Sequence, residues 1–311
     1  MVVGAGAVGS WVAAAAQAGG AAVTAVARGE NGRSMTEHAL RVPLSRRSPV
    51  RLHRFEVVED TAALTGRHVD IAVVAVKSFD TAAVARQLAN LDPPPVAVLS
   101  VQNGVGNEAA LSATGAPVLA GSLTTSVVRS QPGAIGVGRR GGLGLARVTT
   151  GDAPDTTESV PESLVAAFES GGIPVTVFSR AEPMKWSKLL LNHLGTASSA
   201  VVRWPPWRCL RHPGLFQLER LAWLEALDVM KQHGWAPVDL PGYPVPHIAR
   251  LMRWLPPAAT RPLLWRSVRG SGGPCVRPDG DRMAWGNRLG QEVHCRLRVL
   301  CWVLRERAVQ R

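Results

Sequence analysis

Lys188 and Asn192 are the two residues whose types and spacing point most directly to acid–base chemistry. They lie four positions apart in the segment Trp186-Ser187-Lys188-Leu189-Leu190-Leu191-Asn192, so on a helix they share one face. A lysine beside an apolar surface can have its pKa lowered enough to donate a proton near neutral pH. An asparagine one turn away can hold a carbonyl or hydroxyl group in place. The alternative is an ordinary surface lysine whose stem lies along an amphipathic helix.

A glycine-rich segment at the start of the chain, Gly4-Ala5-Gly6-Ala7-Val8-Gly9, is typical of a turn that binds a dinucleotide. Its glycines allow a tight bend, close approach of the backbone to a pyrophosphate and close packing of the next helix. About twenty residues later an acidic residue would bind the ribose 2′-hydroxyl of NAD, but this chain has Arg28, which suits the 2′-phosphate of NADP. We therefore expect NADP as cofactor, with a purely structural glycine turn as the alternative.

Two further polar residues follow apolar stretches that are typical of buried strands. Lys77 comes directly after residues 69–76, and Asn103 follows residues 96–101. Ligands bind outside the carboxyl ends of the strands in a doubly wound sheet, so both residues are candidates for the same cofactor site. The alternatives are an ordinary loop lysine and a turn-forming asparagine. Their joint occurrence with Arg28 favours a site.

The first 179 residues alternate β-rich and helical patterns, which predicts an α/β fold with a Rossmann-type doubly wound sheet. The first strand is short, which is consistent with a natural start a few residues upstream. We expect strands at 1–3, 22–27, 69–76, 95–101, 118–125, 135–145 and 174–178, with antiparallel additions among the later ones. We expect helices at 80–91 and 162–170 and after the glycine-rich turn.

The pattern changes near Ser179 to that of an all-helical C-terminal domain. We expect helices at 186–200, 215–233 and 293–307, and Gly234 as the stop of the second. Its predicted buried face consists of Leu218, Leu221, Leu224 and Met230. The predicted domains are therefore an NADP-binding domain at 1–179 and a helical substrate and catalytic domain at 180–311.

Composition limits the classes of function. The chain has 311 residues and a net charge of +12, and residues 180–311, with 21 basic and 9 acidic residues, account for all of it. The basic residues are dispersed, so we expect a solvated surface and no nucleic-acid partner. No apolar run could span a bilayer and no export signal is present, so we expect a cytoplasmic protein with no membrane partner. The four cysteines and eight histidines show no metal-ligand spacing.

Four motifs in the first two thirds of the chain together resemble the ketopantoate reductase family (2-dehydropantoate 2-reductase). They are the opening glycine-rich turn, Val76-Lys77-Ser78-Phe79-Asp80-Thr81, Gln102-Asn103-Gly104-Val105-Gly106-Asn107-Glu108, and Trp186-Ser187-Lys188 with Asn192. The resemblance implies NADPH-dependent reduction of a 2-keto acid in pantothenate biosynthesis. Lys188 would be the general acid and Asn192 would bind the substrate, while Lys77 and Asn103 would line the cleft. The sequence leaves both a monomer and a homodimer open.

The C-terminal region departs from the family pattern. Thr196 stands where a second asparagine is usual, and Pro274-Cys275 stands where the family has a Pro-Ser pair, so Thr196 and Cys275 become the substrate-binding candidates at these positions. Arg282 occupies the place of a family glutamate. A cation there would lower the pKa of the active lysine. The alternative function is therefore an NADPH-binding family member whose catalysis is lost or altered.

Overall fold

The computed structural model describes residues 1–43, 50–138, 141–148 and 160–270. The chain divides into two compact units, of which the first spans Met1–Ala181 and the second begins at Glu182. The predicted boundary lies two residues before this division. The helix predicted at 293–307 falls outside the described residues.

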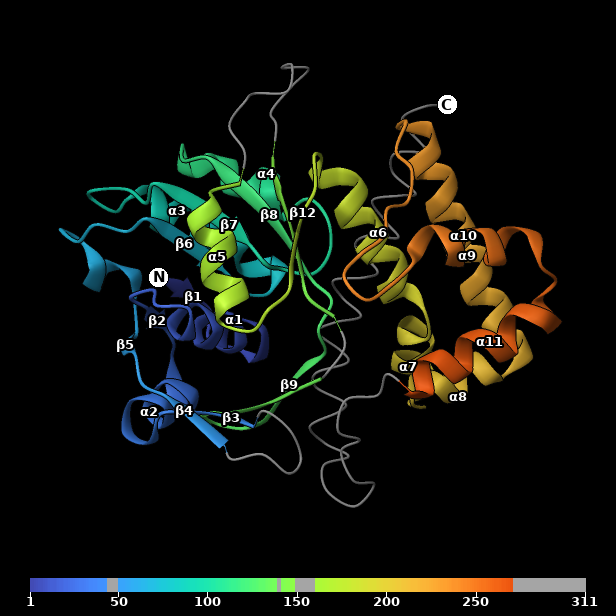
Figure 1. Cartoon of the computed structure of the whole chain (residues 1–311), viewed down its shortest axis with the longest axis horizontal. Helices are drawn as coiled ribbons and strands as arrows, with labels where there is room; N and C mark the ends of the chain where they lie inside the picture. Colours follow the sequence, from blue (N-terminus) through green and yellow to red (C-terminus); the bar gives the residue numbers. More distant parts are fainter. Residues whose placement is uncertain (44–49, 139–140, 149–159, 271–311) are drawn as a thin grey trace. The chain divides into compact units, whose positions relative to one another are not determined.

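An eight-stranded sheet forms the centre of the first unit (Figure 1). Its order is β12-β11-β8-β7-β6-β1-β2-β5, and every neighbouring pair is parallel except β8 and β11. The strands are β1 (Val2–Val3), β2 (Thr24–Val26), β5 (Glu56–Val58), β6 (Ile71–Val74), β7 (Ala97–Ser100), β8 (Val118–Leu123), β11 (Leu143–Arg147) and β12 (Val175–Val177). The strand order reverses at β1, between β2 and β6. This is the doubly wound arrangement that the sequence predicts.

Helices cover both faces of this sheet because successive strand residues point to opposite sides. Val2, Val73 and Leu99 pack with α1 (Ala7–Ala18) and α5 (Glu162–Ser170) in one buried cluster. Val3 and Val74 pack with α3 (Thr81–Ala89) and α4 (Asn107–Leu111) in another. The remaining helical elements of this unit are α2 (Gly29–His38) and the short 3-10 turns η1 (Thr61–Leu64), η2 (Ser78–Asp80) and η3 (Ser112–Thr114).

A second, four-stranded sheet with the order β4-β3-β10-β9 was not predicted. It consists of β4 (Val50–His53), β3 (Leu40–Pro43), β10 (Ala134–Val137) and β9 (Val127–Gln131). The single strand expected at 135–145 is therefore wrong, because β10 and β11 belong to different sheets. Gly141 has a φ of +119° and lies against the backbone of Thr125, a conformation and an approach that favour glycine and let the chain change direction.

The described secondary structure after Ala181 is helical apart from one isolated bridge, Leu240 to Tyr243. The helices are α6 (Ala181–His193), α7 (Thr196–Val202), α8 (Pro206–Arg211), α9 (Pro213–Gln232), α10 (Val245–Trp254) and α11 (Pro257–Gly270). This confirms the helical class. No helix in the described ranges is both long and apolar enough to cross a membrane.

The single helix predicted at 186–200 is wrong, because the helix is interrupted between α6, which ends at His193, and α7, which begins at Thr196. Gly195 has a φ of +76°, and a Cβ on it would lie 2.9 Å from the carbonyl oxygen of Pro206. Glycine at this position therefore ends one helix and lets α8 approach the start of the next.

The predicted buried face of α9 is also wrong. Leu218 is 62% exposed and Leu221 is 49% exposed, whereas Phe216 and Trp223 are completely buried and only Met230 of the predicted set is fully enclosed. The buried face of α9 includes the charged residue Glu219. A prediction that looks only for apolar residues at helical spacing therefore selects the neighbouring face, where Leu218 and Leu221 are exposed. The predicted stop is confirmed: α9 ends at Gln232, and Gly234 has a φ of +69°.

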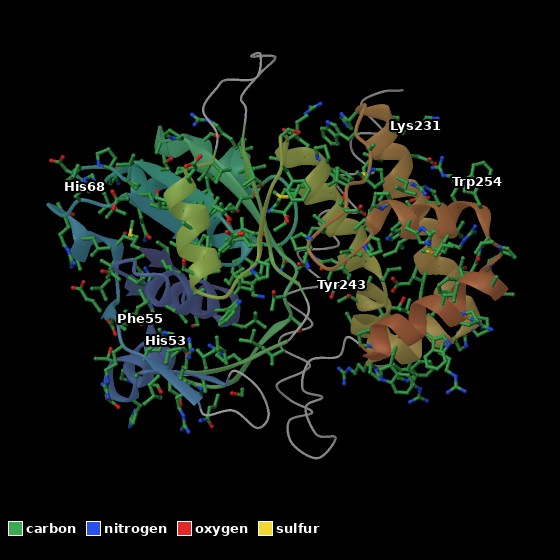
Figure 2. All side chains as sticks on the ribbon, in the orientation of Figure 1. His53, Phe55, His68, Lys231, Tyr243 and Trp254 are labelled. Atoms are coloured by element: carbon green, nitrogen blue, oxygen red, sulfur yellow. The ribbon has the colours of Figure 1, made fainter. Side chains whose placement is uncertain are left out.

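A large apolar side chain is also exposed at the end of α10, where Trp254 is 78% exposed (Figure 2).

Candidate functional site

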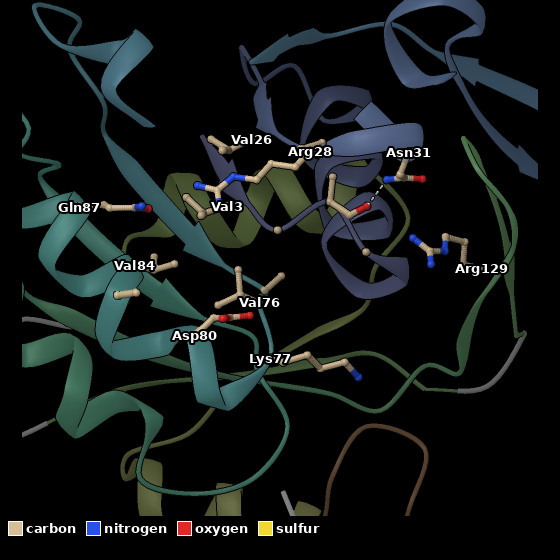
Figure 3. Close-up of a pocket in the computed structure, with 16 residues that line it drawn as sticks. Val3, Val26, Arg28, Asn31, Val76, Lys77, Asp80, Val84, Gln87 and Arg129 are labelled. Atoms are coloured by element: carbon tan, nitrogen blue, oxygen red, sulfur yellow. Dashed lines mark hydrogen bonds between the residues drawn. The ribbon is translucent and has the colours of Figure 1, made fainter. Parts of the chain in front are cut away.

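A cavity of about 380 Å³ lies at the carboxyl ends of β1, β2 and β6. This is the position where doubly wound sheets bind ligands, because the strand order reverses there and leaves a crevice. The lining is drawn in Figure 3 and consists of Val3, Gly4, Ala5, Gly6, Val26, Ala27, Arg28, Asn31, Ala75, Val76, Lys77, Asp80, Ala83, Val84, Gln87 and Arg129. The structure thus brings Gly4, Ala5 and Gly6 of the predicted turn to one cavity with Arg28 and Lys77, whereas Ala7, Val8 and Gly9 are not among the lining residues.

The three glycines of the turn have different physical roles. Gly4 has a φ of +95°, which an L side chain rarely adopts, so it allows the tight bend after β1. A Cβ on Gly9 would overlap the carbonyl oxygen of Gly4 and lie 3.0 Å from Cβ of Ala75, so Gly9 allows α1 to pack closely. A Cβ on Gly6 would meet no protein atom within 4 Å. Gly6 therefore leaves space on the cavity side, where a phosphate can approach the first turn of α1.

Arg28 precedes the first residue of α2 and lies at the edge of the cavity. Its Nε donates to the carbonyl oxygen of Glu59 at 3.1 Å, and its Nη2 lies 3.3 Å from Oδ2 of Asp60. The pKa of Asp60 is lowered mainly by a hydrogen bond from the backbone N–H of Ala62, and Arg28 adds to this shift. Both side chains of the ion pair are more than half exposed, so the pair is weak and Arg28 can exchange Asp60 for a ligand phosphate at small cost.

Lys77 and Asn103 lie at matching positions on neighbouring strands. Val74 of β6 pairs with Ser100 of β7 in parallel register, and each candidate follows its paired residue by three positions. Lys77 lines the cavity, but Asn103 is not among the lining residues. The carbonyl oxygen of Asn103 instead accepts hydrogen bonds from Ser78 Oγ at 3.5 Å and from Asn107 Nδ2 at 3.1 Å.

A buried polar network holds the two loops that carry Lys77 and Asn103. Gln102 Nε2 donates to the carbonyl oxygen of Val76 at 3.0 Å and to Thr81 Oγ1 at 2.8 Å. Thr81 Oγ1 in turn donates to Asn107 Oδ1 at 3.4 Å. The sequence analysis included these three residues in the family motifs but assigned them no positioning role, because their partners are distant in sequence.

Two cavity residues, Asn31 and Arg129, were also missed. Asn31 Nδ2 donates to the carbonyl oxygen of Ala5 at 2.6 Å, and its Oδ1 accepts from the backbone N–H of Gly133 at 3.1 Å. It therefore links the glycine-rich turn to the β9–β10 hairpin. Arg129 lies on β9, and no sequence pattern predicted that the second sheet would contribute to the cavity.

In the second unit, Lys188 and Asn192 lie one turn apart on α6, and both are half-buried. The helix is held by neighbours of its own unit. Trp223 Nε1 of α9 donates to the carbonyl oxygen of Leu190 at 2.7 Å, and the backbone N–H of Val238 donates to Ser187 Oγ at 2.9 Å. These contacts fix the rotation of α6 and therefore the direction of the face that carries Lys188 and Asn192.

Thr196 is the first residue of α7, and Glu219 of α9 holds this helix start in place. The buried Glu219 carboxylate accepts hydrogen bonds from the backbone N–H of Gly195 at 2.8 Å and of Ser198 at 3.1 Å. It acts as a cap supplied by another helix. Cys275 and Arg282 lie outside the described residues. Within the described ranges no group of three or more His, Cys, Asp or Glu side chains could hold a metal ion.

Comparison with solved structures supports the fold. A PanE/ApbA family ketopantoate reductase from Ralstonia eutropha superimposes with a TM-score of 0.67 at 23% identity, with 97% of each chain covered. A D-mandelate dehydrogenase solved with NADH and anilino(oxo)acetate superimposes with a TM-score of 0.66 at 15% identity, covering 82% of this chain and 80% of the other. These likenesses confirm the α/β architecture with a helical C-terminal region.

Comparison of sequences gives a narrower result. The family model described as "Ketopantoate reductase PanE/ApbA" matches residues 1–149. A 2-dehydropantoate 2-reductase from Halobacterium salinarum is 31% identical over 240 residues, which is 74% of this chain and 76% of the relative. Another from Archaeoglobus fulgidus is 28% identical over 234 residues, 75% of this chain and 74% of the relative. The chain therefore belongs to the ketopantoate reductase family.

Proposed function

We propose that this protein reduces 2-dehydropantoate to pantoate with NADPH, as a step of pantothenate biosynthesis. The observation that carries the proposal is the cavity at the strand-order reversal, lined by Gly4, Ala5 and Gly6 of the glycine-rich turn and by Arg28 and Lys77. It occurs in a chain whose curated relatives are named 2-dehydropantoate 2-reductase. The substrate is thus a small 2-keto acid.

The cavity residues fit a nicotinamide dinucleotide. Gly6 leaves open space before the first turn of α1, and backbone N–H groups at a helix start attract phosphate. Arg28 supports the finer choice of NADP, because a guanidinium can form paired, charge-assisted hydrogen bonds with a phosphate. The bound cofactor supplies the hydride for the reduction.

The residues of this chain supply orientation and one proton. The Lys188 ammonium group donates a proton to the carbonyl oxygen of the substrate as that oxygen gains negative charge. Asn192, one turn along the same helix, donates a hydrogen bond that keeps the substrate in register. Thr196 and Cys275 are proposed as further substrate-binding residues. Lys77 is proposed as a residue that lines the cofactor cavity, and Asn103, which lies outside the cavity lining, as a cofactor contact on the neighbouring loop.

The decisive experiment measures NADPH oxidation with 2-dehydropantoate as substrate. We expect turnover by the wild type, and a kcat for Lys188→Ala that is about 10²–10⁴-fold lower because general-acid catalysis contributes on that order. NADPH affinity should be unchanged in this variant. Lys231→Ala, which alters an exposed lysine of α9, is the matched control and should keep wild-type turnover. Absence of turnover in a wild type that binds NADPH would overturn the enzyme proposal and favour the non-catalytic alternative.

The cofactor choice has its own test. Arg28→Ala should weaken NADPH binding by about 10–100-fold, since a hydrogen bond to a charged group contributes about 1.5–3 kcal/mol. NADH has no 2′-phosphate, so its dissociation constant should change little. Equal losses for the two cofactors would show that Arg28 does not bind the 2′-phosphate.

A further inference from the structure

We propose that Arg129, on the β9–β10 hairpin of the second sheet, binds the pyrophosphate of the dinucleotide. The inference rests on the proposed cofactor binding and goes beyond it, because it gives the second sheet a part in the site. Arg129 lies about 120 residues after the glycine-rich turn in sequence, yet it lines the same cavity as Gly4, Ala5 and Gly6 of that turn.

Arg28 and Arg129 approach the cavity from different elements and directions. In Figure 3 the guanidinium of Arg28 points away from Arg129, which lies on the same side as Asn31. The two arginines are therefore suited to different parts of a ligand. A dinucleotide with a 2′-phosphate carries negative charge at two separate places, on the ribose and on the pyrophosphate.

The hairpin that carries Arg129 is held in place relative to the glycine-rich turn. Asn31 bridges the two, with one hydrogen bond to the carbonyl oxygen of Ala5 and one from the backbone N–H of Gly133 at the hairpin turn. Arg129 is opposite Ile135 across the hairpin, and Ile135 is buried in the cluster that contains α1. The backbone at Arg129 is thus positioned by both a polar link and an apolar anchor.

Charge explains why an arginine is useful at this place. The first turn of α1 contains no acidic residue, and no side chain caps it, so its backbone N–H groups attract an anion. A neighbouring guanidinium adds two parallel donors and a full positive charge to this partial one. Arg129 then strengthens binding of NADPH and NADH alike, because both have the pyrophosphate.

The test is direct measurement of dissociation constants for NADPH and NADH by isothermal titration calorimetry. We expect Arg129→Gln to raise both constants by about tenfold or more and by a similar factor, because it removes a charge-assisted contact to a group that both ligands share. Arg129→Lys should give a smaller rise. Arg41→Gln, which alters an exposed arginine of β3 in the same sheet but outside the cavity lining, should change neither constant.

Each other outcome has a distinct meaning. An Arg129→Gln variant with wild-type affinity for both cofactors would overturn the inference while leaving the proposed function intact. A loss confined to NADPH would also overturn it, because Arg129 would then contact the 2′-phosphate. If the wild type binds neither cofactor, both the inference and the proposed function fail. Unchanged thermal unfolding of Arg129→Gln is expected, since its side chain is exposed.

Discussion

Gly6 and Gly9 lie three residues apart in one turn, yet substitution by alanine should affect different properties: cofactor affinity at Gly6 and stability at Gly9. Gly6 has a φ of −72°, which alanine adopts without strain, and its added Cβ would meet no protein atom within 4 Å. Loss of glycine as the residue before the helix is partly offset by the lower entropy of the unfolded chain, so we expect a change in stability of less than about 1 kcal/mol. The new methyl group would occupy the space that the pyrophosphate needs. Gly6→Ala should therefore raise the dissociation constants of NADPH and NADH more than about tenfold.

Gly9→Ala should instead destabilise the first unit. The added Cβ would overlap the carbonyl oxygen of Gly4 and approach Ala75, and a backbone oxygen in a tight turn cannot move aside cheaply. Overpacking costs about 1–3 kcal/mol, and the alanine recovers roughly 0.4–1 kcal/mol through the unfolded state. The net loss is about 1–2 kcal/mol, or roughly 2–8 °C in Tm for a unit of this size.

The assay compares thermal unfolding by circular dichroism with cofactor titration for the two variants. We expect Gly6→Ala to change Tm less than Gly9→Ala does and to lose affinity, and Gly9→Ala to lose several degrees in Tm. A Gly6→Ala variant that binds NADPH as tightly as the wild type would refute the assignment of Gly6 to the ligand. Equal destabilisation by the two substitutions would refute the packing argument.

Two further predictions concern buried and exposed charge. Glu219→Ala should lower the free energy of unfolding by about 2 kcal/mol or more, because two buried backbone N–H groups at the start of α7 lose their acceptor. Urea denaturation measures this change. The control is Glu225→Ala, which alters an exposed carboxylate of the same helix and should have little effect. The pKa of Glu56 is lowered from 4.5 to about 2, first by hydrogen bonds from Arg67. Its stabilising contribution is fully present above pH 4.5 and is lost as pH falls through about 2. Glu56→Gln should therefore lower Tm slightly at pH 7, less so in high salt, and the difference should shrink steadily as pH falls from 4.5 towards 2. A pH-independent difference would contradict this.

The doubly wound core was predictable because its signals are local. Apolar runs such as residues 69–76 and 95–101 are typical of strands buried on both faces, and the glycine-rich turn gives the first crossover its geometry. The structure has β6 and β7 within these ranges. The second sheet was missed because its strands are short and pair across distant parts of the chain, with β10 beside β3.

The helical unit shows the opposite limit of sequence patterns. Leucines at helical spacing indicated one face of α9, but the buried face contains Glu219, whose cost of burial is offset by two backbone donors from α7. A partner of this kind lies on another helix, so no pattern within α9 could reveal it. The break at Gly195 depends likewise on the approach of Pro206.

By itself the sequence was enough to indicate the family, the glycine-rich turn with Arg28, and Lys188 and Asn192 as candidates for proton donation and substrate binding. These depend on residue type and spacing, which a chain carries in any conformation. Only the tertiary structure decided that Lys77 lines the cavity while Asn103 does not, and that Asn31 and Arg129 join it. The reason is physical: a cavity is formed by the ends of several strands, and its lining depends on long-range pairing and register rather than on neighbours in sequence.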